Sequence, residues 1–206
     1  MKLFYRSTYR PLAGFLFCLL LVHTAHAATD INNAALASQD QQGDWRAYGR
    51  NFSEQRFSPL TAINASNAGQ LKLDWSMELP EMKALVSTPL VIDGVMYFSG
   101  SNSIVLAVDG KTGKQLWRYD PQVLKRLANN KAMRHNWGTN RGLAFWQGRV
   151  YVATFDGRLI ALAAATGKEV WSVQTIEPGK ALFITGAPRV FNGLVIIGNG
   201  GADAGA

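Results

Sequence analysis

His135 is a candidate for acid–base chemistry at neutral pH. The sequence has three histidines and one cysteine, but Cys18, His23 and His26 lie in the first 27 residues, which have the pattern of a secretory leader. Without that leader, His135 is the one remaining imidazole, and imidazole can titrate near neutrality. A plain polar residue in a basic loop is the alternative. The sequence excludes a thiolate metal site, a cysteine nucleophile and a histidine-cluster metal centre from residues 28–206.

Three short glycine-containing motifs carry the other candidate side chains. They are Asn140-Arg141-Gly142, Thr185-Gly186-Ala187-Pro188 and Gly201-Ala202-Asp203. Arg141 supplies a guanidinium, which carries a permanent positive charge, Thr185 a hydroxyl and Asp203 a carboxylate. The structural alternatives are an arginine bonded to a strand-edge carbonyl, a threonine that caps a turn and a solvated turn aspartate.

A long internal repeat supplies the elements that must position these residues. The pattern A-x-x-x-x-T-G-K-x-x-W occurs at 107–117 and again at 161–171, and Gly94 and Tyr97 recur as Gly148 and Tyr151. Seven positions therefore share one offset of 54 residues. A repeated unit of this kind predicts an architecture of stacked modules.

Each repeat has the pattern of four short strands. Residues 90–92 and 95–98 flank Asp93-Gly94, which predicts a hairpin, and 145–146 and 149–152 flank Gln147-Gly148. Third strands are expected at 104–108 and 159–162, and Thr-Gly-Lys then turns into a strand that carries a tryptophan. Helical periodicity is confined to residues 122–133. Four-stranded units at this period predict an all-β fold, a β-propeller whose blades dock through tryptophans; a β-sandwich is the less favoured alternative. The docking tryptophans are Trp75, Trp117 and Trp171.

A third copy begins at residue 186, with Gly193 in the turn position, and has no third T-G-K-x-x-W before residue 206. Two blades and part of a third cannot close a ring, and open blades leave strand edges unpaired. We therefore expect the sequence to be the N-terminal part of a longer propeller.

The sequence divides into three parts. Residues 1–27 are expected to be a signal peptide cleaved after Ala27, since a basic start is followed by an apolar stretch at 12–22, too short to span a bilayer, and by Ala25-His26-Ala27. Residues 28–43 are expected to be a flexible mature N-terminus, and residues 44–206 the partial propeller. This predicts a periplasmic protein that does not span the membrane after its leader is removed.

The charge distribution argues against a nucleic-acid partner. Three of the 21 basic residues and none of the 14 acidic ones lie in the leader, so the net charge falls from +7 to +4 on cleavage. The remaining basic residues are scattered, and only residues 125–134 are dense. We therefore expect no nucleic-acid binding.

Two further segments give the sequence a family resemblance. Residues 44–60, DWRAYGRNFSEQRFSPL, and the run from Thr185-Gly186-Ala187-Pro188 to Gly200-Gly201-Ala202-Asp203 accompany the repeat. Together they resemble the quinoprotein alcohol dehydrogenases, periplasmic eight-bladed propellers that use pyrroloquinoline quinone (PQQ) and a divalent cation, usually calcium. The resemblance covers nearly all of residues 44–206. It implies oxidation of a small alcohol by hydride transfer to PQQ, with electrons passed to a cytochrome c or a similar carrier.

The resemblance also assigns site residues. It implies that Arg141 lies at the quinone carbonyls, that Thr185 contacts a cofactor carboxylate and that Gly201 and Ala202 cradle the cofactor. Asp203 stands where the family has a glutamate that binds the cation; calcium is expected, and a lanthanide stays open. The catalytic base, the asparagine cation ligand and the tryptophan beneath the quinone are expected beyond residue 206, so none of the catalytic residues is expected within this chain.

The sequence departs from the family at two places. Val86 stands where members have a glutamate that hydrogen-bonds the quinone, and His135 and Asn136 stand where many members have two adjacent cysteines. We therefore expect His135, Asn136 or Trp137 to meet the cofactor face. Two other functions stay open: a propeller scaffold without catalysis, of the outer-membrane assembly type, and a quinoprotein relative that has lost its cofactor.

Overall fold

The computed structural model describes residues 31–38, 43–83, 85–130, 138–177 and 179–201. The predicted leader with its cleavage site at Ala27 lies outside the described residues. So do four of the predicted site residues: His135, Asn136, Ala202 and Asp203.

The first repeat folds into one antiparallel sheet in the order β1-β2-β3-β4. Its strands are β1 (Leu90–Ile92), β2 (Val95–Ser99), β3 (Val105–Asp109) and β4 (Gln115–Tyr119). Asp93 and Gly94 form the first turn with φ of 51° and 75°, the left-handed pair that two-residue hairpins require.

The second repeat forms the same sheet in the order β5-β6-β7-β8. Its strands are β5 (Ala144–Trp146), β6 (Arg149–Ala153), β7 (Arg158–Ala163) and β8 (Glu169–Gln174). The register shifts by one residue between Ala107 and Val108 in the first sheet and between Ala161 and Leu162 in the second. The same irregularity in strand pairing therefore recurs in both sheets. The four-stranded units predicted from the repeat are confirmed.

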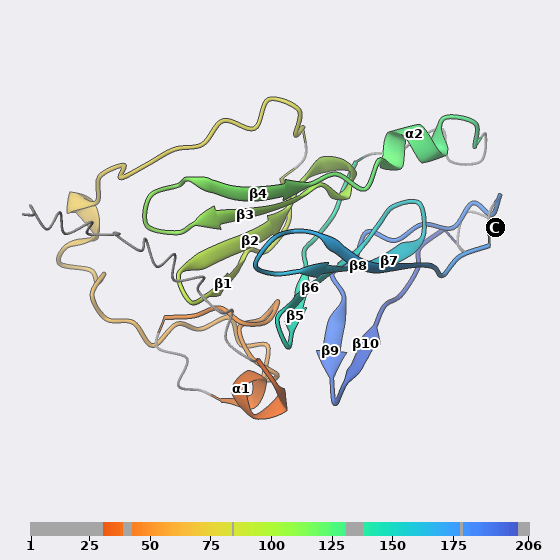
Figure 1. The fold of residues 1–206 in the computed structure, drawn as a ribbon. Helices are drawn as coiled ribbons and strands as arrows, with labels where there is room; N and C mark the ends of the chain where they lie inside the picture. Colours follow the sequence, from red (N-terminus) through yellow and green to blue (C-terminus); the bar gives the residue numbers. More distant parts are fainter. Residues whose placement is uncertain (1–30, 39–42, 84, 131–137, 178, 202–206) are drawn as a thin grey trace, which may run out of the picture.

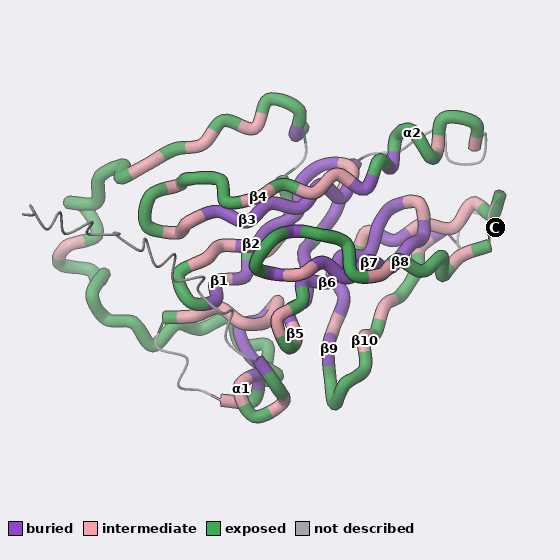
Figure 2. The backbone as a smooth tube through the Cα atoms, viewed as in Figure 1, coloured by how far each residue is buried: buried purple, intermediate pink, exposed green. Residues whose placement is uncertain are grey.

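A third unit starts with the hairpin of β9 (Arg189–Phe191) and β10 (Leu194–Ile196). Figure 1 shows the two four-stranded sheets side by side, with this hairpin beside β5. Side chains from both sheets and the hairpin make one apolar cluster, which includes Tyr97, Phe145 and Val190. In Figure 2 the buried backbone is concentrated in β2, β3, β6 and β7.

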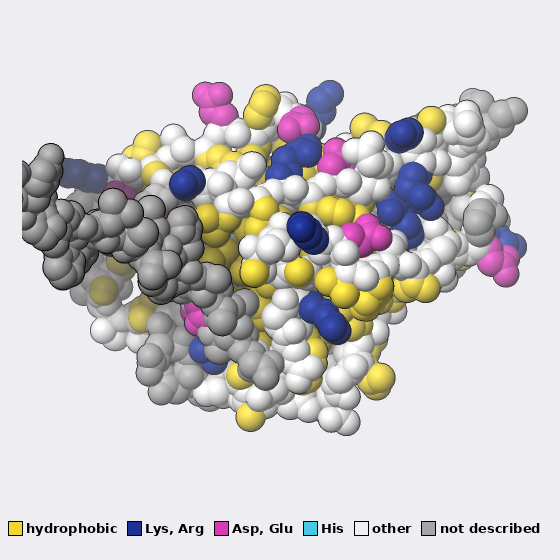
Figure 3. Space-filling view, in the orientation of Figure 1, with side chains coloured by type: hydrophobic (Ala, Val, Ile, Leu, Met, Phe, Trp, Pro, Cys, Tyr) yellow, Lys and Arg dark blue, Asp and Glu magenta, His cyan; other side chains and the backbone are white. Residues whose placement is uncertain are grey.

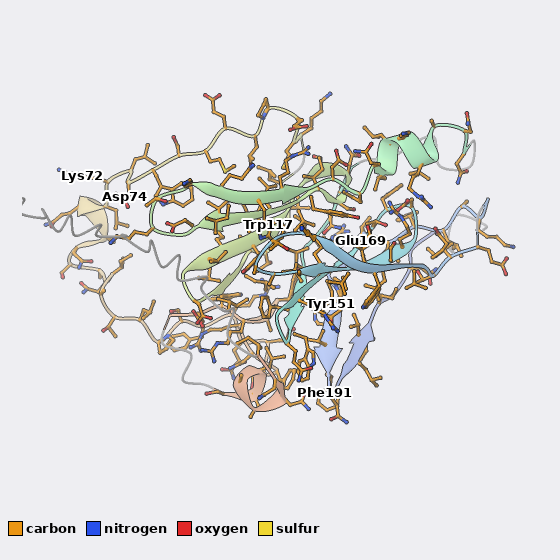
Figure 4. All side chains as sticks on the ribbon, in the orientation of Figure 1. Lys72, Asp74, Trp117, Tyr151, Glu169 and Phe191 are labelled. Atoms are coloured by element: carbon orange, nitrogen blue, oxygen red, sulfur yellow. The ribbon has the colours of Figure 1, made fainter. Side chains whose placement is uncertain are left out.

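Two of the three predicted docking tryptophans, Trp75 and Trp117, hold neighbouring units together. The Trp117 indole donates to the Ala164 carbonyl at 2.8 Å, and the Trp75 indole donates to the Gly110 carbonyl at 3.2 Å. Figure 4 shows Trp117 in the region between the first sheet and β8. Trp75 thus docks on the first sheet as Trp117 docks on the second, although residues 71–79 form no strand.

Residues 57–73 lie along the outside of the sheets, and their large apolar side chains are exposed. Leu73 is 82% exposed and Phe57 66% exposed. In Figure 4, Lys72 lies near the end of this segment, outside the two sheets, and Asp74 follows the segment. Trp75, two residues after this segment, packs on the turn at Gly113 and so holds the end of the segment beside the first sheet.

The helix α1 (Asn33–Ala37) lies within residues 28–43, which we expected to be flexible. The Asn32 side chain accepts from the Ala35 amide and caps the helix. Ile31 and Leu36 are fully buried in the main cluster. The described part of this segment is therefore ordered, because these two apolar side chains pack on the second unit.

A second short helix, α2 (Val123–Leu127), follows the first sheet. It realises the first residues of the helical pattern predicted at 122–133. No helix among the described residues is long and apolar enough to cross a membrane.

Candidate cofactor site at the start of the blades

The segments that lead into the three units lie next to one another. Thr88 precedes β1, Arg141 precedes β5 and Thr185 precedes β9. The Thr88 amide donates to the Arg141 carbonyl at 3.1 Å, and the Arg141 amide donates to the Thr185 carbonyl at 2.9 Å. The motifs that are far apart in sequence are therefore joined through their backbones.

Asn140 holds the Asn-Arg-Gly motif in place. It is fully buried, and its Oδ1 accepts from the Ser99 hydroxyl at 2.6 Å and from the Gly142 amide at 3.1 Å. Its Nδ2 donates to the Ser103 hydroxyl at 3.1 Å and to the Ala153 carbonyl at 2.8 Å. Both ends of the amide are thus satisfied, and the backbone on either side of Arg141 is fixed to both sheets.

The Arg141 side chain is exposed, and its Nη1 donates to the Thr185 hydroxyl. The structure therefore brings together the two side chains that the family resemblance assigned to the quinone and to a cofactor carboxylate. A cation next to a hydroxyl is a donor pair suited to an anionic ligand. These contacts join the two residues but do not test their predicted roles.

Gly201 lies beside the segment that leads to Thr185. Phe183 and Gly200 form an antiparallel bridge with hydrogen bonds of 3.1 and 2.8 Å. Gly201 is buried with φ of 103°, and a Cβ there would collide with the Ala181 carbonyl oxygen. The Gly-Gly pair therefore allows two backbones to approach closely.

Val86 lies two residues before Thr88 and is 52% exposed. Its side chain has no hydrogen-bonding group, so the glutamate contact of the family is missing at this position. Among the described residues no group of three or more histidine, cysteine, aspartate or glutamate side chains could hold a metal. The predicted ligand Asp203 lies outside those residues.

An ion-pair network that sequence reasoning missed anchors α2. The Asp156 carboxylate lies 2.9 Å from Arg126 Nε and 2.8 Å from Arg158 Nε. Arg158 also donates a hydrogen bond to the Pro121 carbonyl at 2.6 Å. Asp156 and Arg158 are both buried side chains. The segment between the two sheets, which carries His135 and Asn136, is thus fixed at its start to the second sheet.

A second missed cluster surrounds Tyr48. The Arg56 and Arg189 guanidinium carbons lie 4.4 and 4.3 Å from the centre of its ring. The only sequence signal was the content of aromatic and basic residues in 44–60, which does not indicate a partner in the third unit.

With this geometry established, comparisons with known proteins identify the family. The family model described as "Glucose/ethanol/alcohol dehydrogenase, beta-propeller domain" matches residues 45–205. The quinohemoprotein alcohol dehydrogenase ADH IIB of Pseudomonas putida is 50% identical over 198 residues, which cover 95% of this chain and 28% of the relative. The dehydrogenase subunit of the alcohol dehydrogenase (quinone) of Komagataeibacter europaeus is 47% identical over 214 residues, or 98% and 29% of the two chains.

Solved structures agree. The quinohemoprotein alcohol dehydrogenase of Comamonas testosteroni superposes with a TM-score of 0.77 at 46% identity, over 87% of this chain and 27% of that one. A europium-containing methanol dehydrogenase gives 0.72 at 31% identity, over 82% and 29%. This chain belongs to the PQQ-dependent alcohol dehydrogenase β-propeller family. It spans little more than a quarter of the length of these relatives.

Proposed function

We propose that this chain is the N-terminal part of a periplasmic quinoprotein dehydrogenase that oxidises a small alcohol. The observation that carries the proposal is the exposed Arg141 guanidinium bonded to Thr185, where the first three units begin. Family membership over residues 45–205 supports it. A cytochrome c or similar protein would accept the electrons.

The residues present fit an anionic quinone with carboxylate groups. Arg141 supplies a permanent positive charge, Thr185 a hydroxyl, and Gly201 a backbone without a side chain. When bound, PQQ supplies a two-electron acceptor, with calcium, or a lanthanide, as the Lewis acid. Arg141 would orient the cofactor and stabilise negative charge at the quinone oxygens. Asp203 would provide one cation ligand, and His135, Asn136 and Ala202 would contact the cofactor.

The test is reconstitution of the complete protein that contains this chain with PQQ and either calcium or a lanthanide. We expect retention of PQQ absorbance after gel filtration, and dye reduction with primary alcohols. Arg141→Ala should lower turnover by about 100-fold. Arg149→Ala, which removes an exposed arginine on β6, should not change it. Loss of PQQ on the column together with no activity on any alcohol would overturn the proposal.

A relative that has lost its cofactor is the second candidate. Val86 favours it, because this exposed valine, two residues before Thr88, cannot hydrogen-bond a quinone. Val86→Glu separates the two functions: in a dehydrogenase it should tighten PQQ binding, and in a relative without a cofactor it should leave the protein without PQQ.

A further inference from the structure

The segment from Asp44 to Arg56 passes along the starts of all three units. Trp45 forms an antiparallel bridge with Val91 in β1, with hydrogen bonds of 2.8 and 2.9 Å. It therefore adds a short edge to the first sheet at β1. We call the segments that contain Thr88, Arg141 and Thr185, directly before β1, β5 and β9, the lead-in segments. Tyr48 follows three residues later, and its carbonyl accepts from the Trp45 indole at 3.3 Å.

Tyr48 lies between two cations that come from different parts of the fold. Arg56 belongs to the same segment, whereas Arg189 opens β9 in the third unit. Both guanidinium groups are within the range in which a ring face attracts a cation. Arg189 is held on its other side by Glu54, whose Oε1 is 3.2 Å from its Nε. The ring thus ties the N-terminal segment to the third unit.

The same ring packs beside the backbone that carries Arg141. A Cβ on Gly142 would lie 3.4 Å from Tyr48 Cδ2, 3.3 Å from the Thr88 carbonyl oxygen and 3.4 Å from Ala187 Cβ. Gly142 is therefore the point where Tyr48, the first unit and the third unit meet. Arg56 Nη1 also lies 3.5 Å from the Thr88 hydroxyl, so one of the two cations on Tyr48 reaches the first lead-in segment.

We propose that Tyr48 is a positioning residue for Arg141: clamped between Arg56 and Arg189, it fixes the spacing of the three lead-in segments and so sets the Arg141 guanidinium against Thr185. The inference rests on the proposed function for its catalytic consequence. Its structural consequence, the order of the lead-in backbone, can be measured without any cofactor.

Two substitutions of Tyr48 separate the ring from its hydroxyl. Tyr48→Phe keeps a ring face for both cations, whereas Tyr48→Leu removes that face. In the complete protein loaded with PQQ and calcium, Tyr48→Leu should lower turnover by about fivefold and Tyr48→Phe by less than twofold. The alcohol KM should stay within twofold for both, since Tyr48 acts through Arg141.

A double-mutant cycle shows whether the effect passes through Arg141. In an Arg141→Ala background, Tyr48→Leu should cause no further loss of turnover. Equal losses in the two backgrounds would overturn the positioning role while leaving the proposed dehydrogenase function intact. If the protein with native Tyr48 has no activity at all, the proposed function fails, and the following measurement still decides the role of Tyr48.

Amide hydrogen exchange at Thr88 and Arg141 reports on the lead-in segments directly, because both amides donate across them. Tyr48→Leu should speed exchange at both amides by about tenfold or more, and Tyr48→Phe should not. Tyr151→Leu is the control, since Tyr151 packs on Trp171 in the second sheet and should leave both amides protected. Should Tyr48→Leu not fold, Arg189→Gln removes one of the two cations and should show the same increase. Unchanged protection in Tyr48→Leu, or in Arg189→Gln if that variant replaces it, would overturn the proposal.

Discussion

Trp117 covers Gly167 so closely that a Cβ on the glycine would lie 2.6 Å from the indole ring. Trp75 stands in the same relation to Gly113, where a Cβ would lie 2.5 Å from the ring. Figure 4 places Trp117 between the two sheets. The Thr-Gly-Lys turn is therefore both a sharp turn and the surface on which the preceding unit docks.

A pair of alanine substitutions separates these two roles of glycine. Gly148 and Gly167 both have φ of 69°, but a Cβ on Gly148 meets nothing within 4 Å. Gly148→Ala should cost about 1 kcal/mol of unfolding free energy through backbone strain alone. Gly167→Ala should cost about 1–3 kcal/mol more, because the indole must move. Urea unfolding measures both, and equal losses would mean that the docking contact carries no energy.

The two repeats also differ at one turn residue, and the difference can be exploited. Asp109 Oδ1 accepts from the amides of Lys111 and Thr112 and from the Thr112 hydroxyl, at 3.1, 2.8 and 2.8 Å. Ala163 occupies the matching position in the second unit. These contacts give Asp109 a structural role in the turn.

Ala163→Asp should therefore stabilise the second turn at pH 7. The hydrogen bonds from Thr112 lower the pKa of Asp109. An aspartate at 163 that accepts the equivalent hydrogen bonds from residues 165 and 166 should also have a lowered pKa. Because the folded pKa is the lower one, the added stability should be full at neutral pH and disappear as the pH falls below about 4. Ala163→Asn is the control: it can accept the same hydrogen bonds, and its gain should not depend on pH. Thermal midpoints across pH check both.

Local sequence signals were enough for the sheets but not for α1. The strands follow from apolar runs and glycine turns, which act within a few residues. Helix α1 has only five residues, too few to show a period. What orders it is the burial of Ile31 and Leu36 against distant residues, including a hydrogen bond from the Gln147 amide to the Ile31 carbonyl.

Tyr97 makes the stability of the fold depend on pH in the alkaline range. Burial, with a smaller contribution from the nearby Asp93 charge, raises the pKa of Tyr97 to about 12. A group whose pKa is raised on folding contributes stability below its unfolded pKa, which is about 10 for tyrosine, and loses it as the pH rises through the folded value. Tyr97→Phe should therefore lose less stability between about pH 10 and 12 than the native protein, by at most ~1.4 kcal/mol per pH unit. Parallel curves for the two proteins would contradict this.

The candidate site was only partly readable from the sequence. The motifs named Arg141 and Thr185, and the structure joins them. Their supports could not be predicted, because they come from distant side chains: Asn140 bonds Ser99, and Tyr48 meets Arg189 from another unit. Figure 3 likewise shows lysine and arginine side chains scattered over the visible face and interspersed with acidic ones, a surface that gives no cue to the site.

Asn140 should contribute to the stability of the fold as well as to the position of the Arg141 backbone. Asn140→Ala removes a fully buried amide with four hydrogen bonds and leaves several buried partners unsatisfied, so we expect a loss of about 2–4 kcal/mol. Ser99→Ala removes only one of those bonds and should cost about 1 kcal/mol. Denaturant unfolding compares the two. Similar losses would mean that water replaces the missing amide without cost.

The Asp156 network offers a sharper contrast, because one carboxylate meets two arginines in different surroundings. The Arg158 side chain is 9% exposed and that of Arg126 is 51% exposed, while the Asp156 side chain is 4% exposed. Asp156→Ala leaves the Arg158 charge buried without its partner and should cost about 3–5 kcal/mol. Arg126→Ala breaks an ion pair whose arginine is solvated and should cost less than about 1 kcal/mol.

The same network has a local consequence for α2. Since Arg126 and the Pro121 carbonyl join α2 to the second sheet through Asp156 and Arg158, Asp156→Ala should also release the start of this segment. Limited proteolysis near residues 121–130 should then be faster at denaturant concentrations far below the unfolding midpoint, and Arg126→Ala should show a smaller increase. If Asp156→Ala lowers the midpoint without any change in cleavage there, the pair stabilises the sheet alone and does not anchor α2.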